Sequence, residues 1–234
     1  MITAYTDMRS DGMTGKRQAI IDRCMKLYVA AFSDAADEVG LGQVCMDSGI
    51  VPLTKNTRMA GFARTGRMVR SPPQQPYDEK QLERLMSLST DAQNGDLLVI
   101  ASGGADDCSV WGQVLTKIGI PKGIQGAIVD GTSRDIVEID EVGFTVFARG
   151  RHPGTMRGRL DVESVNEQIV CGGVVVNPGD LIVADGDGVV VIPQDRIDEV
   201  LKHAEGVVDT DNWWSEKLDE GEDPHDLHKE RPIP

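Results

Sequence analysis

Arg134 and Asp135 are neighbours in the sequence and follow an apolar run, residues 126–129, that ends in Asp130-Gly131. The run predicts a buried strand that presents both side chains at its carboxyl end. Arginine is a permanent cation with a planar fork suited to a carboxylate, and aspartate is a hard oxygen ligand for a divalent metal. The two residues together indicate a site for a small oxo-acid. The alternative is a turn stabilised by a local Arg–Asp pair, since surface pairs are common and weak.

A glycine-rich segment, residues 102–107, follows a second apolar run at 96–101 and precedes a helix predicted over 109–118. Backbone N–H groups at a helix start lack helical partners, so this segment is a candidate for binding an anion. A tight turn is the alternative, because neither a Walker A motif nor a dinucleotide-binding fingerprint is present. Loops at the carboxyl ends of parallel strands share one edge of the sheet, so we expect the segment to face the same crevice as Arg134 and Asp135.

The rest of the chain alternates between helical and extended patterns. Strand, glycine loop, helix and strand over 96–130 form a parallel crossover unit, which predicts one α/β domain. We expect a loose arm at 1–15, the domain at 16–208 and an acidic extension at 209–234, which would pack on a neighbouring subunit. Other helices are predicted at 20–31, 33–40, 78–90 and 197–208, and other strands at 42–46, 58–69, 144–148, 167–170, 172–176, 181–184 and 189–192.

The net charge of −14 argues against a nucleic-acid or anionic-membrane binder, because both need a basic surface. The cysteines are Cys24, Cys45, Cys108 and Cys171, and they form no Cys-x-x-Cys pair. Free thiols fit a reducing compartment, so neither a zinc site nor a disulfide framework is expected. No run approaches the roughly 18 apolar residues of a membrane span. The expectation is a soluble cytoplasmic protein.

Two further stretches extend the motif at the strand end. They are Phe144-x-Val146-Phe147-Ala148-x-Gly150 and the segment 172–193, which contains Pro178-Gly179-Asp180 and Asp185-x-Asp187-Gly188. From about residue 27 to Pro193, the chain resembles the class II pyruvate aldolases that cleave 4-hydroxy-4-methyl-2-oxoglutarate and 4-carboxy-4-hydroxy-2-oxoadipate. That family also contains RraA, the regulator of ribonuclease E, and its members are often mislabelled as dimethylmenaquinone methyltransferases.

The resemblance implies a compact α/β/α-type sandwich of the swivelling phosphohistidine-domain type. It also implies trimers or hexamers with the site at the subunit interface, and Mg²⁺ or Mn²⁺ as cofactor. Asp135 would be the metal ligand, and Arg134 would contact the pyruvate oxygen that becomes the enolate. Backbone amides of Gly112, Gln113 and Val114 would hold the pyruvate carboxylate.

The implied activity is retro-aldol cleavage of a 4-hydroxy-2-oxo acid or diacid, releasing pyruvate, with oxaloacetate decarboxylation as a side activity. The chain departs from the family pattern where Gln113 replaces an acid, and where Asp211, or otherwise Asp209, replaces a glutamate that a neighbouring subunit supplies. A neutral amide hydrogen-bonds water but is no base near neutral pH. Residues that select the rest of the substrate are expected among Arg64, Arg67 and 149–159. The alternatives are a non-catalytic regulator of a ribonuclease and a lyase for another hydroxy or sugar acid.

Overall fold

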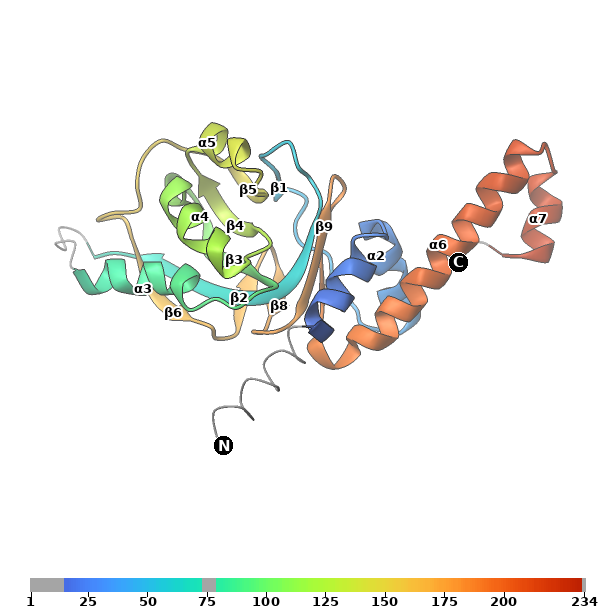
Figure 1. Cartoon of the computed structure of the whole chain (residues 1–234), viewed down its shortest axis with the longest axis horizontal. Helices are drawn as coiled ribbons and strands as arrows, with labels where there is room; N and C mark the ends of the chain where they lie inside the picture. Colours follow the sequence, from blue (N-terminus) through green and yellow to red (C-terminus); the bar gives the residue numbers. More distant parts are fainter. Residues whose placement is uncertain (1–14, 73–78, 233–234) are drawn as a thin grey trace.

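The computed structural model describes residues 15–72 and 79–232 of the chain. An eight-stranded mixed sheet has the order β1-β5-β4-β3-β2-β9-β10, with β6 also paired to β2 (Figure 1). The neighbours β2, β3, β4 and β5 run parallel. The strands are β1 Val51–Pro52, β2 Met59–Arg70, β3 Asp96–Trp111, β4 Ala127–Ser133, β5 Val146–Arg151, β6 Leu160–Val165, β7 Ile169–Cys171, β8 Val174–Val176, β9 Leu181–Asp185 and β10 Gly188–Ile192.

A helical segment at 15–24 precedes the numbered helices. These are α2 Val29–Glu38, α3 Glu79–Thr90, α4 Gln113–Gly119, α5 Ile136–Glu141, α6 Ile197–Asp219 and α7 Pro224–Glu230. Short 3-10 turns lie at Ile120–Lys122 and Gln194–Arg196. Within the described ranges, no helix is long and apolar enough to cross a membrane.

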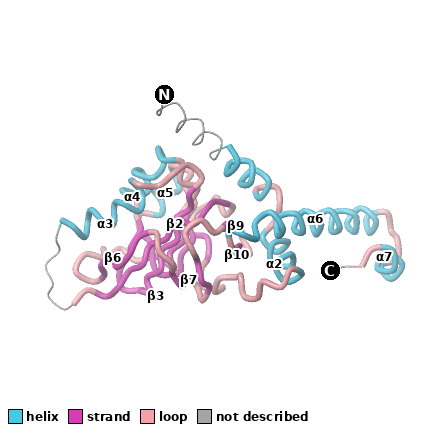
Figure 2. The backbone as a smooth tube through the Cα atoms, turned by 90° about the horizontal axis from the view of Figure 1, so that it is seen from below, coloured by secondary structure: helices cyan, strands magenta, loops and turns pink. Residues whose placement is uncertain are grey.

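The helices gather on one face of the sheet. Side chains alternate between the two faces along each strand, so Phe62 and Arg64 of β2 point to the same face. Arg64 pairs with Leu98 of the neighbouring strand β3, and paired residues share a face. Phe62 and Leu98 therefore lie on the same face. Phe62 belongs to the core cluster under the 15–24 segment, α2 and α6, and Leu98 to the cluster under α3, α4 and α5. The predicted α/β class is confirmed, with the helical cover concentrated on this face (Figure 2).

The opposite face is covered by the β7–β8 hairpin. Ile169 and Cys171 of β7 pack with Val99, Phe147 and Met46 in a third core cluster. Figure 2 shows β7 on the side of the sheet away from α3, α4 and α5. Among the described residues, a small second sheet therefore covers this face in place of helices.

The glycine-rich segment 102–107 belongs to β3, so the prediction of a turn that opens a helix is wrong. The register against β4 shifts between Ala101 and Ala105 and again before Ser109, which identifies irregular, bulged pairing. Gly103 and Gly104 have φ values of 62° and 73°, which glycine adopts without the steric penalty of a side chain. As a result, α4 begins at Gln113, later than predicted.

The closing helix is longer than its apolar pattern predicted. α6 continues from Ile197 to Asp219, and α7 folds back beside its end, so the predicted boundary at 208 falls within a helix. Trp214 is 8% exposed, and its Nε1 donates to the Arg231 carbonyl, so it packs within its own chain. Packing of the extension on a neighbouring subunit stays a prediction.

Three smaller differences concern local elements. The strand predicted at 42–46 is reduced to a bridge between Cys45 and Val190. β6 and α5 were not predicted, because both are short and β6 alternates only weakly between buried and exposed residues. The arm predicted at 1–15 lies, apart from Gly15, outside the described residues.

Candidate active site

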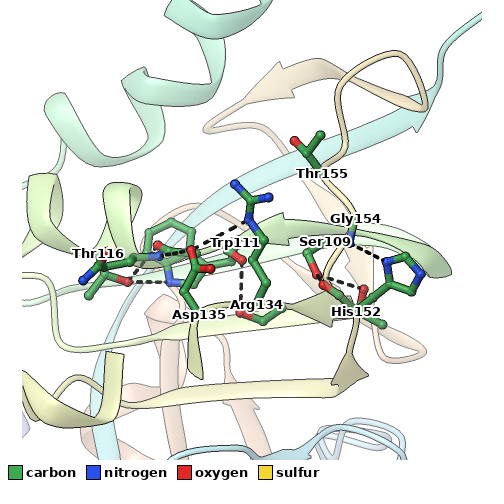
Figure 3. Close-up of polar contacts among 12 residues, drawn as sticks. Ser109, Trp111, Thr116, Arg134, Asp135, His152, Gly154 and Thr155 are labelled. Carbon is green, nitrogen blue, oxygen red and sulfur yellow. Dashed lines mark hydrogen bonds and ion pairs between the residues drawn. The ribbon is translucent and has the colours of Figure 1, made fainter. Parts of the chain in front are cut away.

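Arg134 and Asp135 lie where β4 ends and α5 begins, as the sequence predicted. The Arg134 backbone N–H donates to the Trp111 carbonyl at 3.1 Å, which ties the end of β4 to the end of β3. Asp135 precedes α5 with φ 57° and ψ 34°, a left-handed conformation that aspartate tolerates better than most residues. Arg134 Nε lies 3.7 Å from Asp135 Oδ2, and the two side chains are 41% and 37% exposed (Figure 3).

The start of α4 lies directly against the Asp135 carboxylate. The Gln113 backbone N–H donates to Asp135 Oδ2 at 3.1 Å. A Cβ added at Gly112 would lie 2.7 Å from the same oxygen, so only glycine leaves the carboxylate this position. Thr116 Oγ1 accepts from Trp111 Nε1 at 2.9 Å and donates to the Gly112 carbonyl at 3.1 Å, which fixes the helix start (Figure 3).

A pocket opens on one side of this pair. Arg134, Asp135, Gly112 and Val114 form one end of it, and the segment 155–157 forms another wall. The third wall is α3, which contributes Gln81, Leu82, Leu85 and Met86. The sequence analysis did not connect α3 with the site. The sequence feature that could have indicated this role is the apolar stripe at 82, 85 and 86, whose spacing is typical of one face of a helix.

A second hollow lies on the other side of the pair, between the start of α5 and the segment after β5. Arg134 and Asp135 line it together with Glu138, Arg151 and His152. His152 Nδ1 accepts the Gly154 N–H at 3.0 Å, and its ring lies apart from Arg134 (Figure 3). The carboxylate at position 138 is exposed, one helical turn beyond Asp135.

The predicted residues Gly112, Gln113, Val114, Arg134 and Asp135 therefore lie together. The segment 102–107 does not: its residues line neither of the two hollows, because β3 continues past it to Trp111.

Asp211 belongs to the second half of α6, and α6 extends away from α4 and α5 (Figure 1). Its carboxylate accepts a hydrogen bond from the Tyr28 hydroxyl. Burial and this carboxylate raise the pKa of Tyr28 well above its usual value, so the phenol stays protonated near neutral pH. One copy of the chain does not bring Asp211 to Arg134, and its delivery by a neighbouring subunit stays a prediction.

Arginines expected to select the substrate have mostly structural roles. Arg64 donates to the Leu88 carbonyl at 2.9 Å and so holds the end of α3. Arg67 donates to the Gln168 carbonyl at 2.8 Å. Arg149 pairs with the buried Asp130, whereas Arg157 lines the pocket.

Comparison with known proteins identifies the family. The family described as "RraA-like: Aldolase/RraA" matches residues 29–191. A protein of Halalkalibacterium halodurans, provisionally named 4-hydroxy-4-methyl-2-oxoglutarate aldolase, is 34% identical over 172 residues, which cover 74% of this chain and 75% of that protein. Protein DlpA of Legionella pneumophila is 32% identical over 198 residues, 83% of this chain but only 30% of DlpA.

Solved structures give the same result. A crystal structure of an uncharacterised protein from Pseudomonas syringae pv. tomato is 31% identical with a TM-score of 0.79, over 91% of this chain and 93% of that one. RraAS2 of Streptomyces coelicolor, described as an unusual member of the RNase ES inhibitor RraA family, is 25% identical with a TM-score of 0.74, over 86% and 96%. The chain belongs to the RraA-like family, and the predicted RraA-like fold is confirmed.

Proposed function

We propose that this protein is a divalent-metal-dependent lyase for 2-oxo acids. It cleaves a 4-hydroxy-2-oxo acid or diacid to release pyruvate, and decarboxylates oxaloacetate as a side activity. The observation that carries the proposal is the Arg134–Asp135 pair, held against the first N–H of α4 at the end of a pocket. The relatives provisionally named as aldolases support the same activity.

Asp135 is the residue that would hold Mg²⁺ or Mn²⁺. Its carboxylate is a hard oxygen donor that is 37% exposed at the pocket. No group of three His, Cys, Asp or Glu side chains in the described ranges is arranged to hold a metal. A single carboxylate nevertheless fits Mg²⁺, which keeps several waters and binds through one or two carboxylates plus substrate oxygens. When bound, the ion supplies a Lewis acid for the 2-oxo group.

The residues of the chain then orient the substrate and stabilise charge. Breaking the C3–C4 bond moves its electron pair toward the 2-oxo oxygen, where the fixed charge of Arg134 stabilises it. The start of α4 would hold the C1 carboxylate through backbone amides of Gly112, Gln113 and Val114. The Gln113 N–H donates to the Asp135 carboxylate, so it would exchange that hydrogen bond for one to the substrate carboxylate.

The proton of the 4-hydroxyl must go to a base, and Gln113 cannot accept it near neutral pH. Asp211 from a neighbouring copy in a trimer or hexamer is the candidate. The Tyr28 hydroxyl, which donates to Asp211, would accompany it.

Pyruvate release, followed by lactate dehydrogenase and NADH, tests the proposal. We expect turnover of 4-hydroxy-4-methyl-2-oxoglutarate or oxaloacetate with Mg²⁺ or Mn²⁺, and none with EDTA. Asp135→Asn tolerates the left-handed backbone but removes the charge, and should lower kcat/KM at least about 100-fold. Asp187→Ala, in the exposed β9–β10 turn, is the control. Full activity of Asp135→Asn, or activity in EDTA, would refute the mechanism.

The similarity to RraAS2 and the net charge of −14 support a second candidate, a regulator that covers a basic segment of a ribonuclease. This candidate predicts salt-sensitive binding to the ribonuclease and no turnover of any 2-oxo acid. Binding that is unchanged in Asp135→Asn would separate it from the lyase.

A further inference from the structure

We infer that the substrate carries an apolar group on C4, and that α3 provides the surface that binds it. This inference rests on the proposed function, because it assumes that the pyruvyl half of the substrate binds at Arg134 and Asp135. It concerns the other half of the same molecule.

The pocket leads away from the Arg134–Asp135 pair along apolar side chains. Trp111 and Met156, which are 1% and 6% exposed, form its deep part. Leu85 and Met86 of α3 are partly buried and pack on the core beneath. A substrate anchored at the charged end therefore extends along a hydrocarbon surface.

Two apolar side chains at the pocket are exposed. Leu82 of α3 is 38% exposed and Val114 of α4 is 68% exposed, and both line the same pocket. Covering such groups removes apolar surface from water, which favours an apolar occupant. Their pocket is continuous with the charged pair, so the occupant we assign is the remainder of the substrate.

Three polar side chains of the pocket walls are hydrogen-bonded within the protein, whereas Arg157 is exposed at the pocket. Ser109 Oγ donates to the His152 carbonyl, and Gln81 Nε2 donates to Asp161 Oδ2 at 2.9 Å. Trp111 Nε1 donates to Thr116. The hydroxyl groups of a polyhydroxylated chain would lose their hydrogen bonds to water on binding, and these donors would not replace them. Unpaired polar groups are unfavourable in an apolar site. The walls therefore disfavour a sugar acid.

The reaction for such a substrate balances without another reactant. In R–CH(OH)–CH₂–CO–COO⁻ the C3–C4 bond breaks, and its electron pair forms the enolate of pyruvate. The 4-hydroxyl loses its proton as C4 becomes the aldehyde R–CHO, and a proton added at C3 gives pyruvate. R is the group that would lie against α3.

A series of substrates that differ only in R tests the inference. We expect kcat/KM to rise from 4-hydroxy-2-oxopentanoate to 4-hydroxy-2-oxooctanoate by on the order of 50-fold, since each buried methylene contributes about fourfold. The octanoate should exceed both 4-hydroxy-2-oxoglutarate and a 2-oxo-3-deoxyhexonate. Preference for the diacid would assign Arg157 the dominant role, and preference for the hexonate would favour a sugar-acid lyase. Either result would overturn the inference.

Variants of α3 locate the effect. Leu82→Ala and Met86→Ala should each reduce the ratio of octanoate to pentanoate kcat/KM by about tenfold. Glu83→Ala, on the same helix but outside the pocket, should leave the ratio unchanged. Leu82 is exposed, so its variant remains folded even if Met86→Ala does not. An unchanged ratio in Leu82→Ala with wild-type circular dichroism would refute the role of α3. Turnover of oxaloacetate without a chain-length effect refutes the inference alone, whereas no turnover of any 2-oxo acid refutes the proposed function as well.

Discussion

Replacing Gly112 by alanine tests whether the position of the Asp135 carboxylate controls the activity of the site. Gly112 has φ −168°, an extended conformation that alanine adopts without strain. The effect of the substitution is therefore steric. The new Cβ would lie 2.7 Å from Asp135 Oδ2 and 3.3 Å from Arg134 Cγ, so the side chains of both residues must move.

The size of the shift follows from these distances. Ordinary van der Waals contact begins near 3.4 Å, so Asp135 Oδ2 must move by about 0.7 Å. Such a movement lengthens or breaks its 3.1 Å hydrogen bond to the Gln113 N–H. Misplacement of a catalytic group by about 1 Å can lower the rate about 100-fold. We therefore expect kcat/KM to fall between about tenfold and about 100-fold, or about 1.4–2.7 kcal/mol of transition-state stabilisation.

Stability should change much less than activity. Asp135 is 37% exposed, so water replaces much of the lost hydrogen bond and the destabilisation stays near about 1 kcal/mol. Gly→Ala also lowers the conformational entropy of the unfolded chain, which stabilises the folded protein by about 0.4–1 kcal/mol and offsets part of this loss. Pyruvate release, Mn²⁺ binding by electron paramagnetic resonance and thermal unfolding measure the three properties separately. Activity and Mn²⁺ affinity should fall together.

Gly206→Ala provides a matched control. Gly206 lies within α6, and a Cβ there would meet nothing within 4 Å. This substitution should stabilise the protein by about 0.5–1 kcal/mol without changing activity. Wild-type kcat/KM and Mn²⁺ affinity in Gly112→Ala would show that the carboxylate position does not matter, and would refute the reasoning.

Three further predictions concern stability and reactivity. Asp130→Ala removes the partner of Arg149 whose side chain is only 11% exposed, together with the acceptor of the Gly172 N–H, while Asp47 still pairs with Arg149 at 3.2 Å. Urea unfolding should therefore show a loss of about 1–3 kcal/mol, and a loss below about 1 kcal/mol would contradict a structural role for Asp130. The hydrogen bond from Arg23 lowers the pKa of Glu205, so the pair stabilises the protein above the ordinary Glu pKa and loses this effect as pH falls through the lowered value. Arg23→Met should therefore destabilise by less than about 1 kcal/mol at pH 7, because both side chains are 41% exposed. Its difference from wild type should shrink as the pH falls below the ordinary Glu pKa, and a constant difference would argue against the pair. Cys45 is the exposed cysteine and the other three are buried. The native protein should therefore react with one equivalent of a thiol reagent at pH 8. Mass spectrometry should find the label at another cysteine only if the core opens.

The sequence by itself determined the parts of the site that depend on local pattern. The apolar runs at 96–101 and 126–129 predicted the strands β3 and β4, because a continuous apolar run is buried whichever elements pack against it. Arg134 and Asp135 had to follow the end of β4, since they are adjacent to it in the chain. The parallel crossover predicted that residues 102–107 face the same crevice, and this is wrong. The start of α4, whose Gln113 N–H donates to Asp135 at 3.1 Å, was expected there only from the resemblance to the family.

Only the tertiary structure decided where β3 ends and what encloses the site. The shifted pairing of β3 with β4 depends on the partner strand, which the sequence does not specify. The glycines at 103 and 104 therefore predicted a turn, although they lie within β3. The pocket that α3 shares with the Arg134–Asp135 pair joins residues about fifty positions apart, and no local periodicity specifies such an arrangement. Asp211 is the reverse case: its sequence position suggested a role, but the length of α6 places it away from Arg134 within one chain. Local pattern thus determined the charged pair, and long-range packing decided the pocket around it.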